Sequence, residues 1–250
     1  MISPFNTIFY KYRACALGLN VFFKNNKIRL ILKIVSFLSA AVLLFHAVFI
    51  VVFFIISFFL NFINPPFSNI MYYRKINYNQ NIEKIKFIPL EKIPKKIINM
   101  VVGIEDYKFF EHNGVDVAAL NEAMAVNKEL GYAYRGGSTI TQQLARTLFL
   151  SPKKLYLRKY LEIIIAVEME IALPKERILE LYLNYAEWGN GIFGVETASY
   201  KYYKKSVNKL SGDQLARLVT ILSSPLRYSP YNFGSRKILI QRYQNLLRYY

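Results

Sequence analysis

The sequence is poor in the residues that build disulfides and metal centres. It contains a single cysteine, Cys15, and only two histidines, His46 and His112. One cysteine cannot form an intramolecular disulfide, so a disulfide-stabilised fold is excluded. Because His46 lies within a long apolar run, too few side chains remain for a cluster of histidine and cysteine ligands. We therefore expect no metal site built from the chain's own residues.

Signals for β-strands are also scarce. No run that alternates apolar and polar residues stands out, and neither do hairpin turns or internal repeats. Helical patterns begin near Pro94, which suits the first position of a helix, and Ser211 with Gln214 has the spacing of a capping box. We predict further helices near residues 116–130, 139–149, 153–172, 174–186, 194–203, 211–223 and 235–250. The predicted fold class is all-α.

The first 60 residues contain no acidic residue, and they include one long uncharged run from Ile34 to Leu60. As a helix this run would be about 40 Å long, more than the roughly 30 Å that a bilayer core requires. It is too long for the apolar part of a signal peptide, and residues 61–67 offer no small-residue cleavage site. A buried core helix is the other interpretation. We predict a single uncleaved membrane anchor over residues 34–60.

The charges on either side of this anchor predict its orientation. All the charged residues that precede it are basic: Lys11, Arg13, Lys24, Lys27, Arg29 and Lys33. By the positive-inside rule, residues 1–33 form a cytoplasmic tail and the rest of the chain faces outward. All 16 acidic residues and all but six of the 33 basic residues follow the anchor, which leaves a net charge of about +11 there. Such a charge suits nucleic acid, acidic lipid or a lipid-linked phosphate, and an outward location argues against nucleic acid.

The outward part divides into a linker and a domain. Residues 61–92 are polar and rich in asparagine and lysine, which is typical of a juxtamembrane linker. Tyr72 and Tyr73 in this linker are typical of side chains at the lipid headgroup level. The main domain is expected over residues 93–250.

The first group of candidate functional residues stands where an apolar helix is expected to end, from Glu105 and Asp106 to Gly114. A carboxylate at the rim of a core, partly shielded from water, can act as a general base. Acidic residues after a helix are more often solvated surface residues, and His112 alone is more often a hydrogen-bonded structural residue.

The second group runs from Gly136 to Gln143 and is followed by Arg146. Thr139 and Gln142 have the spacing of a capping box, so a well-capped helix start would explain the pattern. A glycine turn that leads into a hydroxyl-rich helix start is also a site for anions, because free N–H groups and the helix dipole point toward the ligand.

The third group is Arg158, Lys159 and Glu162. Arg158 and Glu162 are four residues apart, and an ordinary salt bridge on a helix surface would explain the pair. Glu162 is, however, the only charged residue between Lys159 and Glu168 in an otherwise apolar helix. A carboxylate buried there is costly unless it is paired or functional.

In this order the groups resemble the glycosyltransferase modules of penicillin-binding proteins, and most of all the monofunctional biosynthetic transglycosylases. That family reads E-D-x-x-F-x-x-H-x-G, then G-x-S-T-I-T-Q-Q, then R-K-x-x-E. A fourth motif, K-x-x-I-L-E-x-Y-L-N, is similar to residues 175–184, and a glycine-rich turn is similar to residues 191–196. The resemblance covers roughly residues 90–232. Arg146 and Thr147 depart from it, because the family usually has lysine and asparagine there.

The resemblance implies a lysozyme-like, two-lobed helical domain that polymerises lipid II. The C4 hydroxyl of the acceptor GlcNAc would join C1 of the donor MurNAc with inversion, releasing polyprenyl pyrophosphate. Glu105 is implied as the general base and Glu162 as the second catalytic glutamate, which orients the neighbouring cations or a divalent ion. The residues implied to bind substrate are Asp106, Phe109, His112, Gly137, Ser138, Thr139, Gln142, Gln143, Arg146, Arg158 and Lys159. No cofactor is required, although Mg²⁺ or Mn²⁺ would suit the reaction.

The resemblance also implies a single-pass protein of the bacterial inner membrane, with a periplasmic catalytic domain. The implied partners are lipid II, the growing lipid-linked glycan and the membrane, with proteins of wall synthesis or division as candidates. Two other functions are open: a lysozyme-like peptidoglycan hydrolase and an inactive scaffold. A transpeptidase is excluded, because residues 151–154 and 206–209 fit S-x-x-K but no K-T-G motif exists.

Overall fold

A computed structural model describes residues 26–131, 136–153 and 155–250. These residues fall into two units, residues 26–51 and residues 52–250, and each is considered by itself. Cys15 and the predicted tail up to residue 25 lie outside the described residues.

Helix α2 (Asn26–Phe59) contains all of residues 26–51 and continues into the second unit. At 34 residues it is about 51 Å long, so it extends beyond the thickness of a bilayer core. Within the described ranges it is the one helix long and apolar enough to cross a membrane, and only 6% of its most apolar window is buried. It begins eight residues before Ile34, where the uncharged run starts, because Lys27, Arg29 and Lys33 are compatible with a helix.

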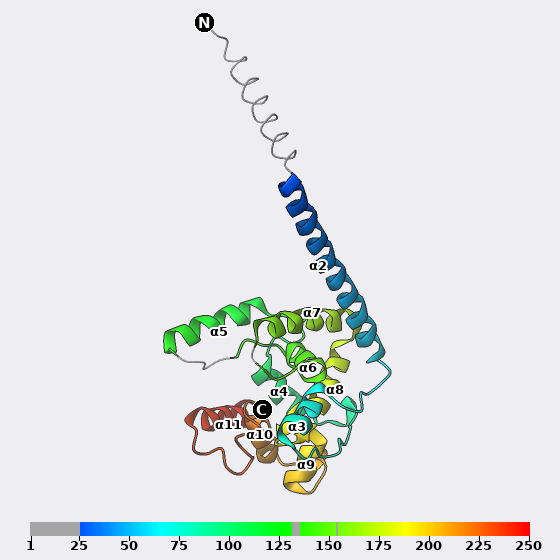
Figure 1. Cartoon of the computed structure of the whole chain (residues 1–250). Coiled ribbons are helices and arrows are strands. Elements are labelled where there is room, and N and C mark those ends of the chain that lie inside the picture. Colours follow the sequence, from blue (N-terminus) through cyan, green and yellow to red (C-terminus); the bar gives the residue numbers. More distant parts are fainter. Residues whose placement is uncertain (1–25, 132–135, 154) are drawn as a thin grey trace. The chain divides into compact units, whose positions relative to one another are not determined.

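The second unit is a helical domain with one small hairpin (Figure 1). After α3 (Asn69–Tyr78) and the short η1 (Leu90–Lys92), its elements are α4 (Lys95–Glu105), α5 (Val117–Leu130), α6 (Ile140–Phe149), α7 (Tyr156–Ala172), α8 (Lys175–Tyr185), β1 (Glu187–Gly189), β2 (Ile192–Phe193), α9 (Val195–Tyr203), η2 (Val207–Lys209), α10 (Gly212–Ile221) and α11 (Lys237–Tyr249). Each helix expected after Pro94 is present, and the capping box of Ser211 and Gln214 is confirmed. Pro94 is the N-cap of α4, one position before the one predicted. The all-α fold class is confirmed for the described part of the chain.

Residues 61–92, expected to form a linker, are packed against the domain. Helix α3 buries Ile70 and Met71 and lies against α6. Further along, the N–H of Ile88 donates to the side-chain oxygen of Asn184 at 2.8 Å, and Asn184 donates back to the carbonyl of Ile88 at 2.9 Å. A few apolar side chains and backbone hydrogen bonds form these contacts, and composition does not reveal the latter, which is why composition alone suggested a linker.

The hairpin of β1 and β2 corrects the expectation that the domain has no strands. Its strands of three and two residues are too short to display an alternating pattern. The turn between them contains Asn190 and Gly191, a pair that favours hairpins because glycine readily adopts positive φ. Gly191 has φ of 72°, and a Cβ atom there would lie 2.3 Å from the carbonyl oxygen of Asn81. The Asn190–Gly191 pair is therefore a local hairpin signal, although the strands beside it are too short to show alternation.

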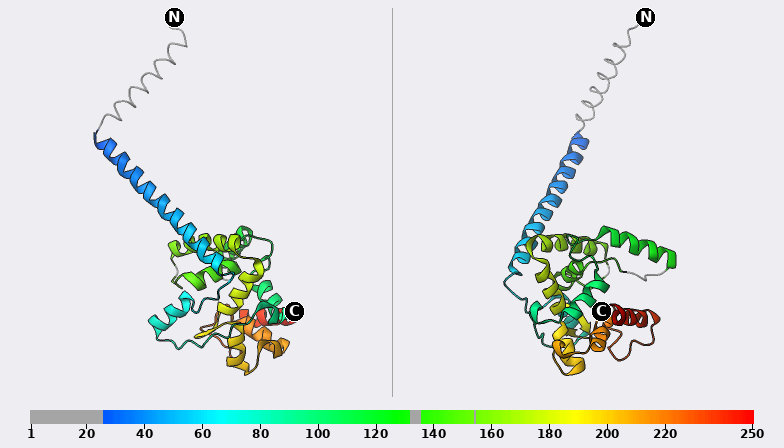
Figure 2. Two further views of the ribbon diagram at one scale, coloured as in Figure 1. Left: turned by 90° about the vertical axis from the view of Figure 1, so that its right-hand side faces the viewer. Right: turned by 180° about the vertical axis from the view of Figure 1, so that it is seen from behind.

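The core of the domain joins helices that are distant in the sequence. Helix α6 packs on α7 and α8, and α10 packs on α4 and α11. Figure 2 shows α6 and α7 toward one end of this unit and α9, α10 and α11 toward the other. The α4 side chains Ile97, Met100 and Val101 are completely buried, so the end of α4 is fixed between the two groups of helices.

Candidate active site

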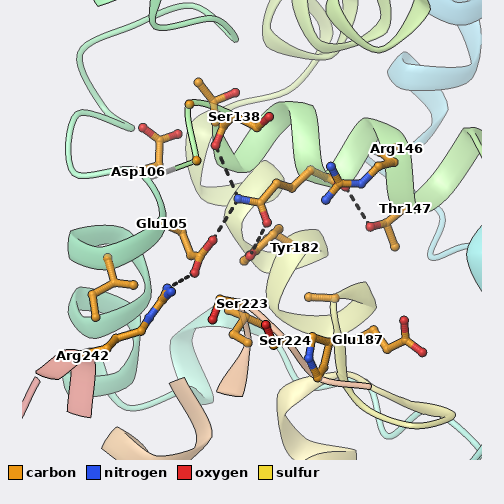
Figure 3. Close-up of a pocket in the computed structure, with 18 of the residues that line it drawn as sticks. Glu105, Asp106, Ser138, Arg146, Thr147, Tyr182, Glu187, Ser223, Ser224 and Arg242 are labelled. Atoms are coloured by element: carbon orange, nitrogen blue, oxygen red, sulfur yellow. Dashed lines mark hydrogen bonds and ion pairs between the residues drawn. The ribbon is translucent and has the colours of Figure 1, made fainter. Parts of the chain in front are cut away.

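A cleft of about 800 Å³ lies between these two groups of helices. The end of α4, the start of α5 and the segment from residue 136 into α6 form one wall. Residues 222–225, Arg227 and Tyr228, and the α11 residues Ile238, Leu239 and Arg242, form much of the other. Figure 3 shows side chains from both walls pointing toward the space between them. This arrangement agrees with the two-lobed domain that the sequence led us to expect.

Glu105 is the last residue of α4 and faces this cleft, with 12% of its side chain exposed. Its Oε2 accepts a hydrogen bond of 3.0 Å from Nε2 of Gln143, and its Oε1 is paired with the guanidinium of Arg242 (Figure 3). Each carboxylate oxygen offers two acceptor positions, so Glu105 keeps acceptor capacity for a hydroxyl group. Glu105 thus has the placement expected of a general base.

A buried tyrosine fixes the orientation of Gln143. The hydroxyl of Tyr182 on α8 donates to Oε1 of Gln143 at 3.1 Å. Since the amide oxygen accepts this bond, the amide NH₂ group is the one that faces Glu105. Burial raises the pKa of Tyr182 well above its usual value, so the phenol stays protonated and remains a donor.

Asp106, next to Glu105, has a different role in this structure. Its carboxylate accepts a bond of 2.8 Å from the backbone N–H of Ile140, the first residue of α6, and contacts Nε2 of His112 at 3.0 Å. Burial raises the pKa of Asp106, and the bonds from Ile140 and His112 act in the opposite direction. Asp106 therefore ties the loop after α4 to the start of α6. This internal carboxylate occupies the predicted anion site at that helix start.

The turn before α6 is held by its own side chains. Thr139 and Gln142 form the predicted capping box, and the Thr139 hydroxyl also donates to the carbonyl of Gly114 at 2.6 Å. At Gly137 a Cβ atom would lie 2.9 Å from the Cα atom of Leu120, so the close approach to α5 requires glycine. These contacts place Ser138 on the rim of the cleft.

Glu162 lies behind this rim, with a completely buried side chain. It is paired with Arg158, which lines the cleft, and its Oε1 lies 2.6 Å from Nζ of Lys159. Lys159 also donates to Oγ of Ser138 at 3.0 Å and to Oε1 of Gln142 at 3.2 Å. Glu162 therefore holds two cations, and Lys159 joins α7 to the turn before α6.

Not all of the predicted site residues line the cleft. Those that do are Glu105, Asp106, Gly137, Ser138, Thr139, Gln143, Arg146 and Arg158. Those that stand behind its surface are Phe109, His112, Gln142, Lys159 and Glu162. Phe109 is fully buried, with Nζ of Lys175 4.5 Å from its ring centre, so it anchors the loop.

Arginines that the sequence reasoning did not select also line the cleft, namely Arg74, Arg227, Arg236 and Arg242. Arg242 contacts Glu105 although 137 residues separate them. No local pattern distinguished it from the other basic residues of the C-terminal helix. Tyr182 was part of a matched motif, but only the fold reveals its bond to Gln143.

Two observations bear on which ions the cleft could hold. In the described ranges no three His, Cys, Asp or Glu side chains gather in a way that could hold a metal. The Arg146 guanidinium lines the cleft and has no hydrogen bond to another described residue, so it can receive an anionic group.

A carboxylate and arginines in one cleft suit glycosyl transfer, and comparisons with known proteins define the class of this helical domain. The family model described as Transglycosylase matches residues 73–249, and the chain belongs to this family. No transpeptidase domain is found in these 250 residues.

The chain is similar to three curated relatives, each named biosynthetic peptidoglycan transglycosylase. The relative from Thiobacillus denitrificans is 45% identical over 63% of this chain and 70% of its own. For Paraburkholderia xenovorans the identity is 38% over 73% of this chain and 80% of the relative. The relative from Bordetella pertussis is 47% identical over 58% of this chain and 62% of its own.

Proposed function

We propose that this chain is a biosynthetic peptidoglycan transglycosylase that polymerises lipid II into glycan strands. The observation that carries the proposal is the cleft in which one carboxylate, Glu105, faces arginines from both walls. A sugar hydroxyl is a weak nucleophile and requires a base, whereas a pyrophosphate leaving group requires positive charge and no acid. Family membership and the names of the relatives support the same activity.

In this mechanism Glu105 accepts the proton of the GlcNAc C4 hydroxyl as its oxygen bonds to C1 of the donor MurNAc. The bond between C1 and the pyrophosphate oxygen breaks, and the electron pair leaves with polyprenyl pyrophosphate. A single displacement of this kind inverts the anomeric centre. The Tyr182–Gln143 contact supports the role of Glu105, because it holds the carboxylate in one position.

The departing pyrophosphate would be held by Arg146 and Arg158, which line the cleft. Lys159 and Glu162 act mainly behind them, since Glu162 pairs with both Arg158 and Lys159. Charge fixed in place before the reaction stabilises a leaving group more effectively than charge that must reorganise. If the substrate pyrophosphate brings Mg²⁺ or Mn²⁺ with it, the ion would add to the positive charge that stabilises the leaving group.

The proposal extends to the location of the chain. Helix α2 would be a single-pass anchor in the bacterial inner membrane, with its basic N-terminal side in the cytoplasm and the cleft outside. The substrates are lipid II and the lipid-linked growing strand. Proteins of wall synthesis or division are the candidate protein partners.

The first experiment separates synthesis from hydrolysis. Purified full-length protein is expected to convert lipid II into long glycan that gels resolve, and to release no muropeptides from purified sacculi. The reason is that cleavage of finished glycan requires protonation of a sugar alkoxide, whereas Glu162 is paired on both oxygens with Arg158 and Lys159 and does not line the cleft, so it is not placed to donate a proton. Muropeptide release without polymer formation would make the chain a hydrolase. If correctly folded protein shows neither polymerisation nor hydrolysis, the result would favour a scaffold.

The second experiment concerns the membrane. Asn61, just after α2, donates to the carbonyl of Ala172 at the end of α7 at 2.9 Å. The exposed apolar side chains along α7 and just before it are Leu155, Tyr156, Leu157, Tyr160, Val167 and Ile171. Together with Tyr72 and Tyr73, this face would rest at the lipid headgroups, close to where the lipid-linked substrate leaves the bilayer.

Residues 61–250, freed of the anchor, are expected to bind vesicles weakly, and more strongly when the vesicles contain anionic lipid, because this part carries net positive charge. The side chains of Tyr156 and Leu157 are 99% and 68% exposed. Replacing both residues with serine should weaken vesicle binding, as measured by co-sedimentation. Leu247→Ser on α11 is the matched control and should not. Equal binding by all variants, or no binding at any salt concentration, would contradict this placement.

A further inference from the structure

The inference concerns Arg242, and it rests on the function proposed above. The Glu105 carboxylate is engaged on both oxygens, by Gln143 from α6 and by Arg242 from α11. Other titratable or charged groups also lie around Glu105. They are Asp106 at the end of α4, Arg146 on α6 and Tyr182 on α8. Among the described residues Arg242 is the one that forms an ion pair with Glu105.

The surroundings of Glu105 oppose its charge in two ways. Its side chain is largely removed from water, and the Asp106 carboxylate is the next residue in the chain. A charge with little access to water is costly unless it is paired. Tyr182 is neutral and its donor is directed at Gln143, so it does not offset this cost. Arg146 is positive but forms no ion pair with Glu105, whereas Arg242 supplies a countercharge in direct contact.

Helix α11 is held firmly enough to place this countercharge. Its Tyr243 is bonded to Asp213 on α10, and Asp213 also accepts a bond of 2.9 Å from Nε of Arg217. Leu239 of α11 is buried against Ile221. The Arg242 side chain therefore approaches Glu105 from a packed helix.

The pair also has a feature that a purely stabilising contact would avoid. Nε of Arg242 is buried and has no hydrogen-bond partner among the residues described. An unsatisfied buried donor is unfavourable for stability. Among the described residues, the contact that holds the guanidinium in this position is the one with Glu105.

We propose that Arg242 is a positioning residue, which supplies the countercharge of Glu105 and orients it for proton abstraction while Tyr182 and Gln143 fix the other carboxylate oxygen. Glu105 retains acceptor capacity on both oxygens, so the pair does not block the base. In this arrangement α11 completes the active site without having to contact the reacting atoms.

The test compares full-length wild-type protein, Arg242→Gln and Arg242→Lys in detergent, with lipid II as substrate across a pH series. For Arg242→Gln the acid limb of the kcat profile is expected to move about one unit to higher pH, because the ionised carboxylate has lost its countercharge. We expect kcat at the optimum to fall about tenfold through misorientation, with KM changing less than kcat. Arg242→Lys keeps the charge and should leave the acid limb near that of the wild type.

Arg248→Gln is the matched control, because Arg248 is an exposed arginine on the same helix and does not line the cleft. Its profile should equal that of the wild type. A second measurement does not depend on activity. Arg242→Gln should lower the apparent unfolding midpoint in the wild-type background and lose this effect in a Glu105→Gln background, because the partner is then neutral.

Several outcomes would overturn the inference. An unchanged acid limb in Arg242→Gln would do so, as would a higher KM with unchanged kcat, which would make Arg242 a substrate-binding cation. Additive effects of Arg242→Gln and Glu105→Gln on the unfolding midpoint would also count against it. This measurement remains possible even if Arg242→Gln is too unstable for the activity assay. If wild-type protein makes no glycan, the proposed function itself fails, and that result is recognised before any variant is compared.

Discussion

Glu105→Gln is expected to lower the rate of lipid II polymerisation by about 10²–10⁴-fold, the range typical for loss of a general base. Glutamine has nearly the same shape but cannot accept the proton of the C4 hydroxyl. It can still contact Gln143 and Arg242, so the domain should remain folded. The measurement is incorporation of labelled lipid II into polymer, together with the unfolding midpoint of each protein.

Glu111→Gln is the control for this substitution. Glu111 lies six residues further on in the same loop region, is exposed, and does not line the cleft. The Glu111→Gln substitution removes the same charge as Glu105→Gln but leaves the proposed base intact, so polymerisation should remain near the wild-type rate. A folded Glu105→Gln protein that synthesises glycan normally would rule Glu105 out as the base.

Glu162→Ala is expected to affect both activity and stability. Removal of one partner from a fully buried ion pair costs about 3–5 kcal/mol. The loss here should lie at or below the lower end of that range, because Arg158 and Lys159 keep some access to water. Polymerisation should fall by at least about 10²-fold, since both cations lose the carboxylate that positions them. Thermal unfolding and the lipid II assay measure the two effects.

Glu168→Gln on the same helix is the matched control. Glu168 is buried and forms no ion pair with other described residues. Burial raises the pKa of Glu168, so its ionised form destabilises the folded chain as the pH rises through that pKa. The neutral glutamine should therefore leave the unfolding midpoint at pH 7 unchanged or slightly higher. Equal losses in the two variants would show that Glu162 has no special role.

Much of the fold could be predicted because its helices carry local signals. Thr139 with Gln142, and Ser211 with Gln214, are capping boxes in the structure as in the sequence. The hairpin at Gly191 was missed because its strands are too short for periodicity, and α3 was missed because it is only partly apolar. Local patterns identify long periodic elements better than short ones.

The candidate site could be predicted only where its residues form local motifs. The burial of Glu162 followed from its isolation in an apolar helix, and its pairing with Arg158 from their spacing. The contact of Arg242 with Glu105 could not be predicted, because it depends on how α11 packs on α10 and how α10 packs on α4. The same limit applies to Lys159, whose side chain is directed toward Ser138 and Gln142.

The distance along the chain between Glu105 and Arg242 has a consequence for biogenesis. A ribosome adds about 5–20 residues per second, so the separation of 137 positions takes on the order of 10 s to synthesise. During this interval the anchor has already left the ribosome, whereas Glu105, the proposed base, lacks its countercharge. The nascent chain would reach the membrane before its catalytic centre is complete, and a product truncated before α11 would be delivered there without a finished active site.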